Sequence, residues 1–331
     1  PPRVPAPGTL QPTAVGSACS VRCRYSTSVV SIQGPAMAST ATAATILGTN
    51  DSVASRVKVR PLLDLAITVC CPSEIAMSHA PLASGTSYTC RLDCGTGARE
   101  MGIALCKEFE GRPMNVFLFI GHTHWDHIQG FPFFQPAYIP GTHLVIHSLR
   151  GSDKSLEKVF TGQMDASYFP VSAGDLMARL QFVELDGTVR LGDVTVSHVY
   201  LNHPGVAIGF RIDVGNKSVV YVSDHEPYSR LSGESPHNMK LDREISEFAR
   251  NANLYIREAQ YTGEEYPSKK GWGHSTWYAA IATARAARVR TLVLFHHHPE
   301  HTDAELEEIL RVAQRDFPST LVAREGTAIP L

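Results

Sequence analysis

The sequence lacks any run of about 18 consecutive apolar residues, which is the length that a membrane-spanning helix requires. It also lacks an excess of charge of either sign, since 30 Lys and Arg residues against 32 Asp and Glu residues give a formal net charge of -2. A nucleic-acid contact would therefore have to come from a local basic patch. The composition predicts no membrane span, and it leaves a nucleic-acid partner open without indicating one.

Cysteine is absent after residue 106, although the chain contains seven of these residues. The odd count and the layout do not indicate the disulfide framework of a small secreted domain. Cys19 and Cys23 have no second pair at the spacing of a zinc site. We therefore expect mostly free thiols and a reducing, cytoplasmic location.

Acidic residues are missing from the first 50 positions, which are rich in Pro, Ser, Thr, Ala and Gly. This composition is typical of a disordered leader, a processed targeting segment or an expression artefact, and the ordered regions of a signal peptide are absent. The apolar patterning of a folded chain begins near residue 57. We predict a leader of unknown role over residues 1–55 and a single domain over residues 56–331.

Short apolar segments alternate with segments of helical periodicity from residue 57 onward. Strands are predicted at 57–60, 65–69, 86–93, 114–120, 144–147, 181–185, 189–191, 194–201, 206–214, 218–223, 254–256, 289–295 and 319–322. Helices are predicted at 98–110, 155–164, 173–180, 243–251, 275–287 and 303–315. The strand-rich middle, with strand-helix-strand order on both sides, predicts an α/β fold with helices outside the sheets.

Four potential metal ligands follow the apolar segment 114–120 within six residues: His122, His124, Asp126 and His127. A strand that ends in a tight loop can direct alternate side chains into one cavity, so the two pairs could face two cations. The alternative is a polar loop whose histidines bond to water or backbone. That loop would crowd three imidazoles and a carboxylate with no cation among them, which desolvation disfavours.

Three further strand ends carry ligand side chains, namely His203, Asp224 and His296. Taken alone, His203 could be a turn residue before Pro-Gly, Asp224 a helix cap and His296 a solvated histidine. Four strand ends that offer ligands in this order are hard to obtain by chance. Together they predict a metal centre.

The H-x-H-x-D-H loop followed by His, Asp and His at strand ends resembles the metallo-β-lactamase-fold hydrolases. The resemblance implies a four-layer αββα sandwich and two Zn²⁺ ions, with Mn²⁺ or Fe²⁺ also possible. It assigns His122, His124 and His203 to one metal, Asp126, His127 and His296 to the other, and Asp224 to a bridge between them. Asp93, before the turn Gly95-Thr96-Gly97, matches the aspartate that supports the metal loop from outside.

Within that superfamily the sequence resembles the ribonuclease Z-like and cyclic phosphodiesterase-like branch, which has a bridging Asp and a His-Ser-Thr turn, here residues 274–276. His274 then resembles the residue that handles a proton at the leaving group. The alternative is that His274 is simply an N-terminal residue of the helix, with Ser275 as the cap. Residues 84–88 match the branch's glycine-rich turn only loosely. No inserted basic arm for tRNA is evident, which argues against tRNA 3′ processing.

The resemblance implies a zinc-dependent hydrolase that uses a metal-bridging hydroxide, with Asp126, Asp224 and His274 as catalytic residues. A phosphodiester is the expected substrate, either cyclic nucleotide-like or small. One alternative is hydrolysis of a lactone or β-lactam, or hydrolytic dehalogenation of an aromatic compound. Another is a non-catalytic or redox metal-binding relative, which is disfavoured because a redox site needs an acidic ligand where His124 stands.

Aromatic residues near the predicted centre could contact a small-molecule substrate by stacking. Basic residues there are few, which favours a small phosphodiester or a neutral aromatic compound over a long polyanion. Several of these aromatics could instead be core residues. The predicted substrate wall consists of Trp125, Phe133, Phe134 and Trp272. The aromatic and proline-rich segment 131–140 predicts a homodimer by analogy with the fold.

Overall fold

The computed structural model describes residues 66–71, 74–78, 88–151, 154–325, 327, 329 and 331. The predicted leader and the strand predicted at 57–60 lie outside the described residues. None of the described helices combines the length and the apolar content that a bilayer crossing needs.

Among the described residues, the first sheet contains six strands in the order β1-β2-β3-β4-β5-β6. Strands β1 to β3 pair antiparallel, whereas β3 to β6 run parallel to one another. The bounds are β1 Ala66–Cys71, β2 Glu74–Ser78, β3 Tyr88–Leu92, β4 Asn115–Phe119, β5 His143–Ser148 and β6 Arg179–Glu184.

In the part of the chain that the structure describes, the second sheet contains seven strands in the order β13-β12-β11-β10-β9-β8-β7. Strands β10 to β13 are parallel, and β7 to β10 are antiparallel. The bounds are β7 Val189–Leu191, β8 Val194–Tyr200, β9 Ile208–Val214, β10 Lys217–Val222, β11 Leu254–Glu258, β12 Thr291–Phe295 and β13 Thr320–Val322.

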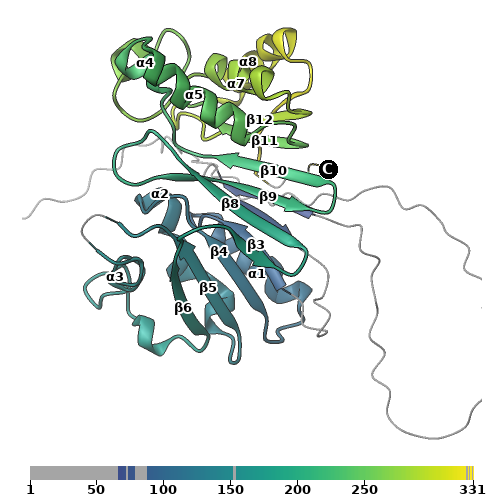
Figure 1. Cartoon of the computed structure of the whole chain (residues 1–331). Helices are drawn as coiled ribbons and strands as arrows, with labels where there is room; N and C mark the ends of the chain where they lie inside the picture. The colour runs from purple at the N-terminus through teal and green to yellow at the C-terminus, as the bar shows by residue number, and fades with distance from the viewer. Residues whose placement is uncertain are drawn as a thin grey trace, which may run out of the picture.

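The helices lie outside the two sheets, and Figure 1 shows α4, α5, α7 and α8 gathered beyond the second sheet. The 3-10 turns of the described segments lie at Phe131–Phe133, Gln135–Tyr138 and Ala173–Asp175. The helix bounds are α1 Ala98–Glu108, α2 Trp125–Ile128, α3 Leu156–Gly162, α4 Tyr228–Ser232, α5 Pro236–Phe248, α6 Tyr266–Lys269, α7 Trp277–Ala287 and α8 Asp303–Asp316.

The four layers follow from the alternation of side chains along buried strands. In β10, Val219 and Tyr221 belong to the apolar cluster between the sheets, together with Phe119 of the first sheet. Val220 and Val222 face the other way and pack with residues of α5, α7 and α8. A third cluster joins α1 to the outer face of the first sheet. The predicted αββα sandwich is therefore confirmed.

Two local predictions were wrong. Residues 173–180 do not form a helix, because the chain makes one 3-10 turn and then enters β6 at Arg179, which pairs with His143 of β5. Tertiary pairing overrides the local helical pattern there. The helix predicted at 243–251 begins earlier, at Pro236, because the Ser235 side chain caps it by accepting a hydrogen bond from Asn238 N.

Candidate metal centre

The predicted ligand loop follows β4, a strand whose central side chains are buried between helix α1 and the second sheet. The chain turns sharply after Ile120, where Gly121 N donates a hydrogen bond to Asp93 Oδ1 at 2.7 Å. The next six residues carry all four predicted ligands of the loop. His203, Asp224 and His296, which follow β8, β10 and β12 of the second sheet, meet this loop.

One group of four side chains consists of His122, His124, His203 and Asp224, whose candidate ligand atoms all lie within 4.8 Å of one another. His124 Nδ1 lies 3.1 Å from His122 Nε2 and 3.0 Å from His203 Nε2. Oδ2 of Asp224 lies 3.4 Å from His122 Nε2 and 3.6 Å from His203 Nε2. This set is called the first group below.

The second group consists of Asp126, His127, Asp224 and His296. Oδ2 of Asp126 lies 3.2 Å from Nε2 of both His127 and His296. The other carboxylate oxygen of Asp224, Oδ1, lies 3.3 Å from His127 Nε2 and 3.4 Å from His296 Nε2. Asp224 therefore presents one oxygen to each group, as a bridging ligand would.

These distances agree with those expected around a cation. Four ligands ~2.0–2.1 Å from a tetrahedral zinc ion lie about 3.3 Å from one another. Asp224 Oδ1 and His127 Nε2 are buried and have no hydrogen-bond partner, although each belongs to a strongly polar group. Buried polar atoms are normally paired, so these two indicate a missing partner that lies between them. Nitrogen and carboxylate donors of this kind suit Zn²⁺ and related divalent ions.

The electrostatics of the first group favour the ligand forms of its members. Burial lowers the pKa of both His122 and His203 below the usual range, so these imidazoles are held neutral. Burial alone would raise the pKa of Asp224, but His296 and His127, whose own pKa values are raised, and a hydrogen bond from His122 hold the Asp224 pKa well below the usual range. A neutral imidazole and an ionised carboxylate are the forms that bind a divalent cation.

Asp93 contacts the loop from the side away from the two ligand groups. Its Oδ2 lies 2.9 Å from His127 Nδ1 and accepts a hydrogen bond from the Tyr221 hydroxyl at 2.6 Å. Asp93 has φ +60°, a left-handed conformation that few non-glycine residues adopt, and His296 has φ +54°. Backbone strain of this kind is held in place at functional sites by the surrounding structure.

His274 lies beside the shared carboxylate, with its Nε2 4.0 Å from Asp224 Oδ2. Its ring stacks on that of His296, with centroids 5.2 Å apart and an interplanar angle of 14°. Burial lowers the pKa of His274 to about 3. The cap of α7 is Thr276, which accepts a hydrogen bond from Ala279 N, so the alternative that Ser275 caps the helix was wrong. Ser275 instead accepts a hydrogen bond from buried Arg257.

Three of the four residues predicted to form the substrate wall are exposed, with Trp125 at 65%, Phe133 at 55% and Trp272 at 59%. Phe134 is 1% exposed, so its assignment to the wall is corrected: it belongs to the core between α1 and the first sheet. The two 3-10 turns at 131–138 direct neighbouring phenyl rings to opposite sides, and periodicity could not assign them.

A set of buried residues that support the centre was not predicted from the sequence. Tyr221 holds Asp93, whereas Glu226, Arg257 and Glu258 bind the turn that carries His274. Glu258 Oε1 accepts hydrogen bonds from Arg257 at 2.9 Å and from Ser275 N at 2.8 Å. One signal was present: Arg257 and Glu258 are adjacent charges at the end of the apolar strand 254–258.

Comparisons with known proteins agree with this geometry. Residues 92–297 match the family described as the beta-lactamase superfamily domain. The chain is 33% identical over 92 residues to ribonuclease Z of Treponema pallidum, an alignment that covers 28% of this chain and 30% of the relative. It is 25% identical over 266 residues to ribonuclease Z of Leuconostoc mesenteroides, covering 66% of this chain and 81% of that protein.

A solved structure shows the same fold. Yeast PDE1 superposes with a TM-score of 0.55 at 14% identity, covering 82% of this chain and 97% of that chain. The family match spans more than half of the sequence and includes every predicted ligand. The chain therefore belongs to the beta-lactamase superfamily domain family.

Proposed function

We propose that the protein is a dinuclear zinc hydrolase that acts on phosphodiesters. The observation that carries this proposal is the shared carboxylate of Asp224, which directs Oδ2 to the first group and Oδ1 to the second. A carboxylate with one oxygen toward each of two three-ligand sets is suited to hold two cations close together. His122, His124 and His203 would hold one ion, and Asp126, His127 and His296 the other.

When bound, two such ions would activate water near neutral pH and neutralise charge on a phosphate group. The chain supplies the remaining functions. His124 and Asp126 are the exposed members of their groups, so a substrate can reach the centre from their side. Asp224, which is 2% exposed, would orient the attacking group from the buried side of the centre. Exclusion of water by a bound substrate would strengthen the charge interactions among these residues.

His274 is proposed as the group that handles the proton at the leaving oxygen. Its Nε2 lies 4.0 Å from the Asp224 carboxylate, within reach of a substrate bound at the centre. Burial keeps its pKa at about 3, so the imidazole is neutral in the absence of substrate. A negatively charged phosphodiester beside it would raise that pKa and favour the protonated form that donates.

The names of the relatives and the exposed aromatic residues support the proposed substrate class. The curated relatives in Treponema pallidum and Leuconostoc mesenteroides are both named ribonuclease Z, which supports a phosphodiester. The exposed rings of Trp125, Phe133 and Trp272 suit an aromatic base or aryl group. The near-neutral charge of the chain favours a small or cyclic phosphodiester over a long polyanion.

The test is a metal analysis followed by an activity screen of the zinc-loaded full chain. We expect about two zinc ions per chain, and zinc-dependent turnover of bis-p-nitrophenyl phosphate or a cyclic nucleotide. The panel includes a lactone, a cephalosporin and a chlorinated aromatic nitrile. Folded, unchelated protein that holds no metal would overturn the metal centre. Turnover confined to the non-phosphate substrates would overturn the phosphodiester assignment and leave the centre intact.

A further inference from the structure

Glu226 is a fully buried carboxylate with no role in either ligand group. Its oxygens accept hydrogen bonds from neutral donors. The Tyr266 hydroxyl donates to Oε1 at 2.7 Å and Gly271 N donates to the same oxygen at 3.0 Å, whereas Gly273 N donates to Oε2 at 3.0 Å. A buried carboxylate is costly unless several donors satisfy it, so this arrangement is tightly defined.

The donors of Glu226 belong to the turn that supports His203. The carbonyl oxygen of Gly273 lies 2.9 Å from His203 Nδ1 and accepts its hydrogen. With Nδ1 protonated, the lone pair of His203 is at Nε2, which points to His124 Nδ1 at 3.0 Å. A histidine ligand is normally oriented in this way, by a hydrogen bond from its other ring nitrogen.

The turn has little freedom to take another position. Gly273 has φ +85°, and a Cβ atom on it would lie 2.3 Å from His203 Nδ1. The backbone of Glu226 also holds the residue before His203, since Glu226 N donates to Asn202 O at 2.9 Å and Asn202 Nδ2 donates to Glu226 O at 2.8 Å. Glu226 therefore holds both the residue that precedes His203 in the chain and the turn that accepts the hydrogen bond of the His203 ring.

We infer that Glu226 is a positioning residue that sets the metal affinity of the first group and leaves that of the second group unchanged. The selectivity follows from the ligand sets, because His203 belongs only to the first group. The inference rests on the proposed function, since it requires that both groups bind metal. It assigns to Glu226 an effect transmitted through Gly273, with no contact to the metal or the substrate.

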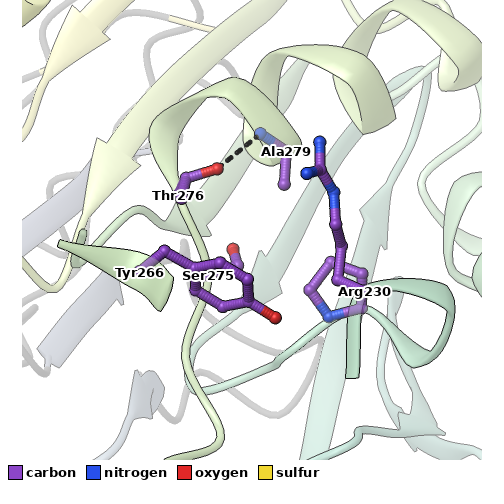
Figure 2. Close-up of a pocket in the computed structure, with 6 residues that line it drawn as sticks. Arg230, Tyr266, Ser275, Thr276 and Ala279 are labelled. Atoms are coloured by element: carbon purple, nitrogen blue, oxygen red, sulfur yellow. Dashed lines mark hydrogen bonds between the residues drawn. The ribbon is translucent and has the colours of Figure 1, made fainter. Parts of the chain in front are cut away.

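The substitution Glu226→Gln tests the contact at nearly constant volume. Gly271 N also lies 3.1 Å from Oε2, so a glutamine oxygen in that place could accept from both glycine amides while its NH₂ group faces the Tyr266 hydroxyl. The amide oxygen is a neutral acceptor, and hydrogen bonds to a carboxylate are about twice as strong, so Gly273 is held less firmly in this orientation. In the opposite orientation the NH₂ group would face Gly273 N, and that bond would be lost. Tyr266→Phe is the matched control. It removes one neutral donor from the same carboxylate and leaves both glycine amides bonded to it. Tyr266 also lines a small pocket together with Arg230 and Ser275 (Figure 2).

The experiment is a zinc titration of the full chain against a competing chelator, with two binding constants fitted for each variant. We expect E226Q to weaken one of the two zinc ions by about 10–100-fold, and Y266F to change both constants by less than about threefold. A double-mutant cycle identifies the affected ion. In the His296→Ala background E226Q should weaken the remaining zinc ion, whereas in the His203→Ala background it should have no further effect.

Each outcome decides the inference. Equal weakening of both ions, or a lowered melting temperature with both constants unchanged, would reduce Glu226 to a structural role and overturn it. A wild-type chain that binds no zinc overturns the proposed function itself, which is a different result. Should E226Q fail to fold, Glu226→Asp replaces it, because the shorter side chain keeps the charge and withdraws the oxygens from Gly273 N. The same selective loss is then expected, and its absence counts against the inference.

Discussion

Oδ2 of Asp93 lies 2.9 Å from Nδ1 of His127, and neither side chain is exposed to solvent. The two residues are 34 positions apart and come together because the turn after β3 packs against the loop after β4. The bond directs Nε2 of His127 toward Asp126 and Asp224. It fixes the orientation of one imidazole of the second group, as the hydrogen bond from His203 to the Gly273 carbonyl oxygen does in the first group.

Asp93→Asn should weaken the zinc ion of the second group by about 10–100-fold, because a neutral amide holds the imidazole less firmly than a carboxylate does. Chelator competition measures the two constants. Tyr221→Phe is the control, since it removes another donor to the same oxygen without altering the charge. Unchanged zinc constants in the Asn variant would leave Asp93 with no role in the centre.

His274→Ala should lower kcat by roughly 10²–10⁴-fold for phosphodiesters with alkyl leaving groups, the usual range for a lost general acid. Esters of p-nitrophenol should lose far less, because that leaving group departs without a proton. Steady-state kinetics on both substrate types with equal zinc loading gives the comparison. Equal losses on the two types would contradict proton transfer by His274.

Phe133 and Phe134 provide a matched pair for comparing an exposed ring with a core ring. Phe134→Ala should lower the free energy of unfolding by about 3–5 kcal/mol because it opens a cavity beside α1. Phe133→Ala should change it by about 1 kcal/mol or less, since this ring is 55% exposed. Urea unfolding checks both values. A larger loss for Phe133→Ala than for Phe134→Ala would contradict the assignment.

Gly130 marks a close approach between two loops of the site. A Cβ atom there would lie 1.7 Å from the carbonyl oxygen of Gly95, so Gly130→Ala should cost about 3 kcal/mol or more and reduce zinc binding. Gly162→Ala is the control because no atom lies within 4 Å of the added carbon. The melting temperature of Gly130→Ala should be clearly lower than that of Gly162→Ala, measured side by side.

His147 gives a pH dependence that is independent of the metal. It is 4% exposed and its ring stacks on Phe119 at 4.6 Å; burial lowers its pKa to about 4. In the unfolded chain the imidazole has a pKa of about 6.5. The contribution of His147 to the free energy of unfolding is therefore fully present above that pH, and it is lost as the pH drops toward 4. We expect a loss of about 2 kcal/mol between pH 7 and pH 5.

The variant His147→Phe isolates this contribution from the other histidines. Urea unfolding at several pH values should show the wild type losing stability relative to the variant as the pH falls. A constant difference between the two proteins across this range would show that His147 retains an ordinary pKa in the folded state.

Much of the arrangement could be predicted from the sequence because the signals are local. Each candidate ligand lies in the loop or turn after a segment that was predicted as a strand and forms one, and parallel strands bring such ends together at one edge of a sheet. The structure brings all seven predicted ligands together. Their role as metal ligands stays a prediction that the zinc titrations test.

The remaining features depend on contacts between distant residues. Glu226 binds amides 45 and 47 positions away, and no periodic pattern reports such a bond. The neighbours Phe133 and Phe134 differ in burial only because α1 packs closely on this segment, with Gly102 beside Gln135 N. Residues 173–180 form no helix because β5 offers a free strand edge. These outcomes are decided by packing rather than by local propensity.

The two ligand groups draw on both sheets, since His122 to His127 follow a strand of the first sheet and the other three ligands follow strands of the second. Ions bound there would cross-link the two halves of the sandwich noncovalently, closing loops that span residues 122 to 296. Folding and metal uptake would then be thermodynamically linked, and the free energy of unfolding would rise with the logarithm of the free zinc concentration.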